Sequence, residues 1–233
     1  MTQKLLVELR PYMLTDAYEF DKKESIDSTF LKNKMFYRVN EKDSLFWTLY
    51  ILIHGYEAYE SLLSTSFLVE KEEKFRYLDI LKDPYSKVLL KEKNVKNLKN
   101  VVENNLSNDE TITVKTFITL AILHKIDFLF VEKNKIFKNG MLSKQVGDNT
   151  NLHIVRYDPE KRVCTIDMHF SVEETNKLLS KFFPWESIDN PFKSISYYTF
   201  DELLEIATKI GYESNNGKIT KSQLYKYIES HVR

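Results

Sequence analysis

The chain has 233 residues, and its 34 basic side chains balance its 34 acidic ones. Because the formal net charge is zero, no overall field attracts nucleic acid or an anionic membrane, and any such contact must be local. The length allows one main domain with a small appendage. The single cysteine, Cys164, excludes an internal disulfide and a cysteine-rich zinc site, which suits a reducing compartment.

The sequence favours an intracellular protein without a membrane contact. The longest apolar run, residues 45–53, is interrupted only by Thr48 and is too short to span a bilayer. The segment MTQKLLVELR carries Glu8 where a signal peptide needs an unbroken apolar core. The patterns GxGxxG and GxxxxGK[ST] do not occur, which excludes the usual phosphate loops.

The first half of the chain is predicted to be mainly helical. Residues 1–41 lack a clean period and are expected to be irregular or partly helical. Residues 43–64 are apolar all round at their start and amphipathic later, which predicts a helix whose first half lies in the core. Two amphipathic patterns follow, over residues 69–83 and then to about Asn105, and the apolar density of residues 113–126 predicts a second buried helix.

Two β-hairpins are predicted after this second buried helix. In DFLFVEKNKIFKNG (127–140) two apolar stretches flank a polar tetrapeptide. In residues 152–170 two alternating stretches flank DPEK, whose proline stands where a type I turn prefers it. Ser171 and Glu174 then have the spacing of a capping box at the start of another helix.

The C-terminal residues show a pattern of helix, extended loop and helix. Thr199 with Glu202, and Thr220 with Gln223, have the spacing of capping boxes ahead of two amphipathic segments. Each segment is therefore expected to begin a helix at its cap.

Together these patterns predict an α+β fold. We expect a mainly helical body over residues 1–190 with a small antiparallel sheet of two hairpins, followed by a two-helix module over residues 195–233.

The segment KDSLFW (42–47) places an acid and a hydroxyl at the start of the first buried helix. A side chain there meets unpaired backbone N–H groups and the positive end of the helix dipole, which can ionise a cysteine thiol. The segment resembles the Asp-x-x-Cys-Leu-Phe nucleophile segment of the ovarian-tumour type of deubiquitinase, a papain-like family, with Asp43, Leu45 and Phe46 in matching types. The order of predicted elements is similar over residues 40–170.

Ser44 stands where this resemblance places the cysteine. A serine hydroxyl is too weak an acid for a helix terminus to ionise, so it would need a general base. The resemblance implies a histidine on a later strand, which would be His153 or His169. The alternative is structural, because Asp43 and Ser44 are both preferred N-cap residues.

Other titratable residues are expected to be structural. Cys164 lies in a strand pattern away from any helix start, which indicates an inert core thiol. His54 and His124 lie inside apolar helices and are expected to be packed and hydrogen-bonded. Because the five histidines are scattered, with no HxxxH or HxH pair, we expect no metal and no cofactor.

The C-terminal pattern resembles the SAP and helix-extended-loop-helix family, whose small two-helix units often bind nucleic acid. The resemblance and local basicity make Lys218, Lys221, Tyr225 and Lys226 the candidate nucleic-acid-binding residues. Acidic residues nearly balance the basic ones over residues 199–233, so a protein-docking role stays open.

The combination of a D-[ST]-L-F-W helix segment with an ELxxIA…GK…K tail resembles proteins of large cytoplasmic DNA viruses, which implies a viral origin and a location in the host cytoplasm or the virion. We therefore expect a non-catalytic interaction protein, with a protease-like body lacking the cysteine and a tail that docks to nucleic acid or a protein partner. The alternative is an active peptidase or deubiquitinase-like hydrolase that uses Ser44 with His153 or His169.

Overall fold

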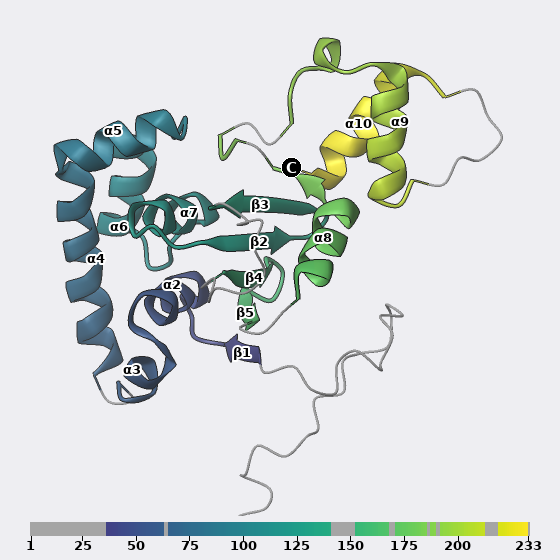
Figure 1. Ribbon diagram of the computed structural model, residues 1–233. Coiled ribbons are helices and arrows are strands. Elements are labelled where there is room, and N and C mark those ends of the chain that lie inside the picture. Colours follow the sequence, from purple (N-terminus) through teal and green to yellow (C-terminus); the bar gives the residue numbers. More distant parts are fainter. Residues whose placement is uncertain are drawn as a thin grey trace, which may run out of the picture. The chain divides into compact units, whose positions relative to one another are not determined.

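The computed structural model describes residues 36–62, 65–140, 152–167, 171–185, 187–189, 192–212 and 219–232 (Figure 1). Its helices and strands, in chain order, are β1 (Phe36–Val39), α2 (Ser44–His54), α3 (Tyr56–Glu60), α4 (Ser66–Lys82), α5 (Pro84–Glu92), the π-helical segment η1 (Leu98–Glu103), α6 (Asn104–Asn108), α7 (Val114–Leu123), β2 (Phe128–Glu132), β3 (Lys135–Asn139), β4 (His153–Asp158), β5 (Val163–Asp167), α8 (Val172–Lys181), β6 (Phe183–Pro184), the 3₁₀ turn η2 (Ile195–Tyr197), α9 (Phe200–Lys209) and α10 (Lys221–Val232).

The strands of the described residues form one mixed sheet of six strands in the order β1-β5-β4-β2-β3-β6. The pairs β1–β5, β5–β4 and β2–β3 are antiparallel, whereas β2–β4 and β3–β6 are parallel. The prediction of a small antiparallel sheet of two hairpins is therefore wrong, although both hairpins are present.

The sheet was underestimated because its additional pairings are long-range. Strand β4 joins the two hairpins by pairing with β2 in parallel, and local alternation gives no sign of such a register. Strand β1 has four residues and β6 has two, so neither is long enough to show a period. Strand β1 lies in a segment that the sequence pattern left irregular, and β6 lies where the pattern predicted the end of the helix that begins at Ser171.

Helices cover both faces of the sheet, as Figure 1 shows. On one face Phe128 and Phe130 of β2 join the main core with residues of α2 and α7. On the other face Leu129 and Val131, which alternate with them, form a smaller cluster that includes Leu178 and Leu179 of α8. Strand β2 is apolar throughout its buried part because both of its faces are covered.

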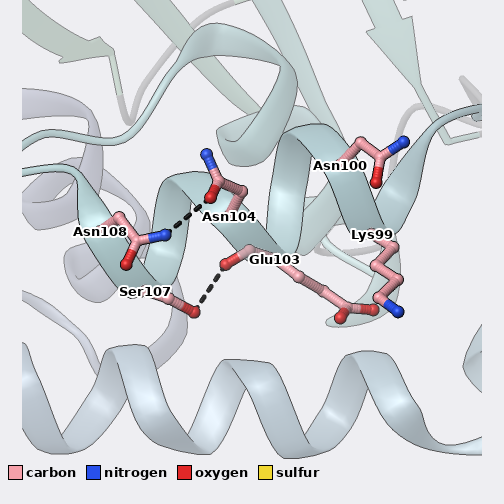
Figure 2. Close-up of a pocket in the computed structure, with 6 residues that line it drawn as sticks. All are labelled: Lys99, Asn100, Glu103, Asn104, Ser107 and Asn108. Atoms are coloured by element: carbon pink, nitrogen blue, oxygen red, sulfur yellow. Dashed lines mark hydrogen bonds between the residues drawn. The ribbon is translucent and has the colours of Figure 1, made fainter.

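The helical region between α4 and α7 differs in detail from the predicted pattern. The stretch that ends near Asn105 consists of α5, the π-helical η1 and α6. Figure 2 shows the polar outer surface of η1 and α6, where Asn108 Nδ2 donates to Asn104 Oδ1 at 2.6 Å.

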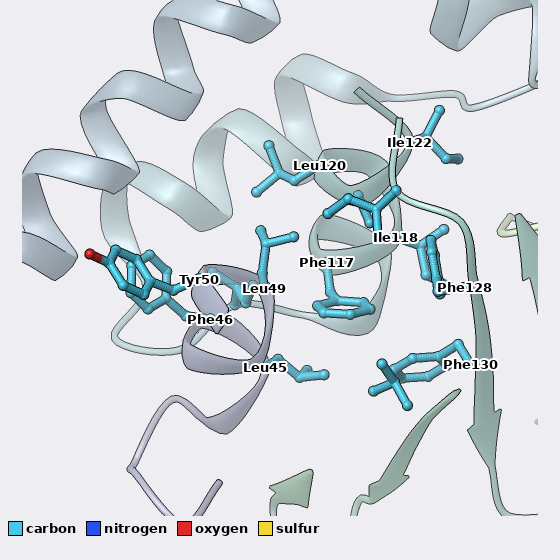
Figure 3. Close-up of a cluster of buried hydrophobic side chains, with 14 of the residues drawn as sticks. Leu45, Phe46, Leu49, Tyr50, Phe117, Ile118, Leu120, Ile122, Phe128 and Phe130 are labelled. Carbon is cyan, nitrogen blue, oxygen red and sulfur yellow. The ribbon is translucent and has the colours of Figure 1, made fainter. Parts of the chain in front are cut away.

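Helix α2 provides much of the main core. Eight of its eleven residues are buried, and Figure 3 shows Leu45 and Leu49 on the side of α2 that faces Phe117 of α7. The predicted helix over residues 43–64 is broken at Gly55, whose φ of 89° lies in the left-handed region that glycine adopts without strain. Helix α3 follows directly.

A buried carboxylate fixes the start of α2. Asp43 is the N-cap: its Oδ1 accepts the N–H of Phe46 at 3.2 Å, and its Oδ2 accepts the N–H of Ile112 at 2.9 Å. The Nζ of Lys74, on α4, lies 3.1 Å from the same carboxylate and 2.7 Å from Glu70. Burial raises the pKa of Asp43, and Lys74 acts in the opposite direction.

The C-terminal helices have an apolar cluster of their own, in which Leu203 and Ala207 of α9 pack with Leu224 and Ile228 of α10. Phe183 of β6 belongs to the same cluster. The predicted boundary between a body and a module at residues 190–195 stays a prediction.

The three predicted capping boxes are confirmed by reciprocal hydrogen bonds. They are the pairs Ser171 with Glu174, Thr199 with Glu202, and Thr220 with Gln223.

Replacing Lys74 by methionine should destabilise the fold strongly. The variant keeps most of the side-chain volume but leaves the buried Asp43 carboxylate without its cation, and such a loss costs about 3–5 kcal/mol. Lys82→Met is the matched control on the same helix, since the Lys82–Asp79 pair is exposed and should contribute less than about 1 kcal/mol. Urea unfolding measures both; equal losses in the two variants would contradict the assignment.

Candidate functional site

The structure places Ser44 at the first turn of α2, where it is 3% exposed. Its Oγ donates to the carbonyl of Arg162 at 2.7 Å and lies 3.6 Å from the Sγ of Cys164. The helix is therefore capped by Asp43, and Ser44 does not serve as the cap. Arg162 has a φ of 52° in the turn between β4 and β5, so the Ser44 hydroxyl ties that turn to the start of α2.

Cys164 lies beside the start of α2, and the prediction that it lies away from any helix start is wrong. Strand β5 packs on α2 and carries the thiol there, across 120 positions of sequence. Burial raises the pKa of Cys164 to about 11, although hydrogen bonds with Thr48 and Ser44 act to lower it. The thiol is protonated at neutral pH, which agrees with an inert core cysteine.

The structure does not bring His153 to Ser44. His153 begins β4, whereas Tyr157, four residues further along the strand, pairs with Cys164 next to Ser44. Four residues of extended strand span about 13 Å, well beyond hydrogen-bonding reach. Burial lowers the pKa of His153, partly offset by Asp127. The other candidate base, His169, lies outside the described residues.

A polar cluster not anticipated from the sequence lies where α2, α4 and α7 meet. His54 Nε2 is 3.2 Å from Arg76 Nη2, and Arg76 forms an ion pair with Glu73 at 2.6 Å. The ring of His124 packs edge-on against Tyr77, with 5.5 Å between ring centroids. These residues come from three helices that are far apart in sequence. The sequence pattern could predict that single residues are buried, but not that they meet.

This cluster cannot serve Ser44. His54 stands at the opposite end of α2, and the helix rises about 1.5 Å per residue, which places the two residues about 15 Å apart along the axis. His124 is packed as expected, but its Nε2 is buried without a hydrogen-bond partner among the described residues. Burial, together with the charges of Arg76 and His54, lowers the pKa of His124 to about 4.

The candidate nucleic-acid-binding residues of the C-terminal helices have different environments. Lys218 lies outside the described residues. The ring of Tyr225 stacks on Phe192 with 4.8 Å between centroids, and its hydroxyl donates to the carbonyl of Lys193. Tyr225 therefore holds the preceding segment against α10. Lys226 is exposed on α10, and Lys221 is half-buried.

Two of the cations of this region, Lys209 and Lys221, have acidic neighbours, whereas Lys226 forms no ion pair with another described residue. Lys209 pairs with Glu205 at 2.9 Å. Hydrogen bonds from Thr199, and to a lesser degree the charge of Lys221, lower the pKa of Glu202. The local field that an anionic ligand would meet is correspondingly weak.

Exposed apolar side chains precede α9. Tyr197 is 63% exposed, and Ile195 and Phe200 are exposed beside it in sequence. The Nζ of Lys193 lies 4.0 Å from the centroid of the Tyr197 ring. Exposed aromatic residues with an adjacent cation are typical of binding surfaces.

Two further findings concern ligands and membranes. Within the described ranges, no group of three or more His, Cys, Asp or Glu side chains is arranged to hold a metal ion. No helix in the described part of the chain is long and apolar enough to cross a bilayer.

Comparison with protein-family models, with curated proteins and with solved structures found no match for this chain.

The acid sensitivity of the fold should depend on His124. The folded-state pKa of His124, about 4, lies below the ordinary value of 6.5. Between these two pH values the imidazole is protonated in the unfolded chain and neutral in the folded chain. Protonation of His124 therefore favours the unfolded state: its effect on the free energy of unfolding is absent above pH 6.5 and lowers that free energy as pH falls toward 4. We expect His124→Gln to lose less stability than the wild type between about pH 7 and about pH 5, measured by urea unfolding. Identical pH slopes in the two proteins would contradict this.

Proposed function

We propose that the protein is a non-catalytic interaction protein whose C-terminal helices dock onto a protein partner. The observation that carries the proposal is the exposed apolar set Ile195, Tyr197 and Phe200, which lies just before α9 and at its first residue. Aromatic residues are enriched at the centres of protein interfaces, where they bury a large area at low entropic cost.

A protein partner is favoured over nucleic acid at these helices for two reasons. The cations of Lys209 and Lys221 have acidic neighbours, which weakens attraction to phosphate. Tyr225, which could otherwise stack on a base, already stacks on Phe192. One exposed lysine that forms no ion pair with another described residue, Lys226, is a small footprint for phosphate compared with the exposed apolar side chains.

The non-catalytic character is supported by the surroundings of Ser44. Its hydroxyl is buried and donates to the Arg162 carbonyl, and His153 lies about 13 Å away along β4. A nucleophile needs a base within hydrogen-bond reach and a path to its substrate. The resemblance to papain-like enzymes, the intracellular location and the viral origin stay predictions.

Partner binding is tested with the double variant Ile195→Ser/Tyr197→Ser in the full chain. A photo-crosslinking residue at position 197 first captures and identifies the partner, and the affinity of the purified pair is then measured. We expect the double variant to bind at least about tenfold more weakly, because truncating a central aromatic residue costs about 2 kcal/mol. Folding should be unaffected, since both side chains are exposed.

Phe67→Ser is the matched control for this experiment. Phe67 on α4 is 65% exposed and has the Nζ of Lys71 at 4.5 Å from its ring, much as Tyr197 has Lys193. The proposal fails if the control loses as much affinity as the double variant, or if the captured molecule is nucleic acid. A fluorophosphonate or ubiquitin probe that labels the wild type but not Ser44→Ala would establish the hydrolase alternative.

A further inference from the structure

One basic segment of this neutral protein contains α5 and most of η1. Residues 84–102, which cover α5, the connection to η1 and most of η1, hold five lysines and a single acid, Glu92. The lysines are Lys87, Lys91, Lys93, Lys96 and Lys99. The segment therefore carries four net positive charges in a chain whose formal net charge is zero.

These five lysines, named here the α5–η1 lysines, are all exposed, and none forms an ion pair with another described residue. Elsewhere many lysines are paired: Lys42 with Glu110, Lys82 with Asp79, and Lys161 with Asp158. Clustered cations without counter-charges repel one another and create a local positive potential that attracts anions.

The acids nearest to the segment are largely engaged elsewhere. Asp83 caps α5 by accepting the N–H of Ser86, and Glu110 pairs with Lys42. Asp109 accepts a hydrogen bond from Asn105 at 2.7 Å. Two carboxylates stay beside the lysines: the exposed Glu92 within the segment, and Glu103 at the end of η1.

The backbone that carries the lysines is held in place. Val95 is buried between Lys93 and Lys96, and its N–H donates to the carbonyl of Leu90 at 2.9 Å. The N–H of Lys96 donates to Asp189 at 2.9 Å, and its carbonyl accepts Lys115 Nζ at 2.6 Å. The charges are therefore presented from a fixed connection, which reduces the entropy lost when a ligand binds.

Amide side chains extend the same surface beyond the lysines. An open hollow of about 530 Å³ is lined by Lys99, Asn100, Glu103, Asn104, Ser107 and Asn108 (Figure 2). The amides of Asn100 and Asn104 can donate to phosphate and sugar oxygens, as asparagines do in many nucleic-acid complexes, whereas the Ser107 hydroxyl already donates to the Glu103 carbonyl. Glu103 opposes an anion at this point, so we expect the main phosphate contacts at the lysines.

An exposed aromatic ring lies at the start of α5. Tyr85 is 63% exposed, and Lys125 Nζ lies 5.7 Å from its ring centroid. Such a ring can stack on an unpaired base. The combination of unpaired lysines, amides and an aromatic ring is therefore the chemistry of a nucleic-acid surface.

We propose that the α5–η1 lysines bind the phosphate backbone of a nucleic acid without reading its sequence. Lys87 and Lys91 are one helical turn apart on α5, and the other three follow along the connection and η1, so the cations form a continuous track in sequence. This function is separate from partner binding at the C-terminal helices and does not depend on it.

The test is the affinity of the full chain for labelled single-stranded and duplex DNA and RNA, measured by fluorescence anisotropy over a range of salt concentrations. Each neutralised phosphate contributes about −0.9 to the slope of log Kobs against log salt on duplex DNA, so five contacts predict a slope of about −4 to −5. The triple variant Lys87→Gln/Lys91→Gln/Lys93→Gln removes three of the five contacts. It should make the slope of log Kobs against log salt less negative by about 2 to 3 and weaken binding at least about tenfold.

The matched control is Lys42→Gln/Lys161→Gln/Lys209→Gln, which removes the same charge from exposed lysines in ion pairs. It should bind as the wild type does, within about twofold. The proposal is overturned if the wild type binds no nucleic acid, if the two triple variants lose affinity equally, or if binding occurs only to vesicles of anionic phospholipid. Because Ile195→Ser/Tyr197→Ser should keep nucleic-acid binding, a failure here is distinguishable from a failure of partner docking.

Discussion

The buried carboxylate of Asp43 is the contact on which the centre of the molecule depends. It caps α2, accepts the N–H of Ile112 and lies against Lys74 of α4, so one side chain joins three segments. A buried ion pair need not add net stability, because desolvation offsets much of its attraction. It does impose one arrangement, since each alternative leaves a buried charge or a backbone N–H unpaired. With the start of α2 fixed in this way, Ser44 meets Arg162 and Cys164 of the β4–β5 hairpin.

That arrangement explains why a nucleophile-like segment stands in an environment without nucleophile chemistry. The helix terminus could favour an anion, but Asp43 already occupies its N–H groups with a negative charge. Cys164 lies beside Ser44, yet burial keeps its thiol protonated. A second anion in this place would be repelled by Asp43, and the pKa of the thiol is itself raised by that carboxylate as well as by burial.

What could be predicted from the sequence was whatever depends on residues close together in the chain. The cap at Asp43, the three capping boxes and the two hairpins rest on spacings of a few positions, and all are present. The parallel register of β2 with β4 and the meeting of Ser44 with Cys164 depend on tertiary packing, which no local pattern encodes. The stacking of Tyr225 on Phe192 could not be expected for the same reason, because Phe192 lies in a segment without secondary structure.

The net charge can be read from the sequence, but the ion pairs that decide where charge remains can be read only from the structure. A formal net charge of zero argues against a field around the whole molecule, but it says nothing about how ion pairs distribute the remaining charge. Pairing removes the effect of Lys74, Lys115 and Lys209, whereas the α5–η1 lysines keep theirs. An apolar surface before α9 and a cationic surface on α5–η1 differ in physical character: the first gains from excluded water, and the second gains from released counterions. The two proposals therefore differ in the salt dependence that they predict: rising salt should weaken nucleic-acid binding at the second surface and leave partner binding at the first intact.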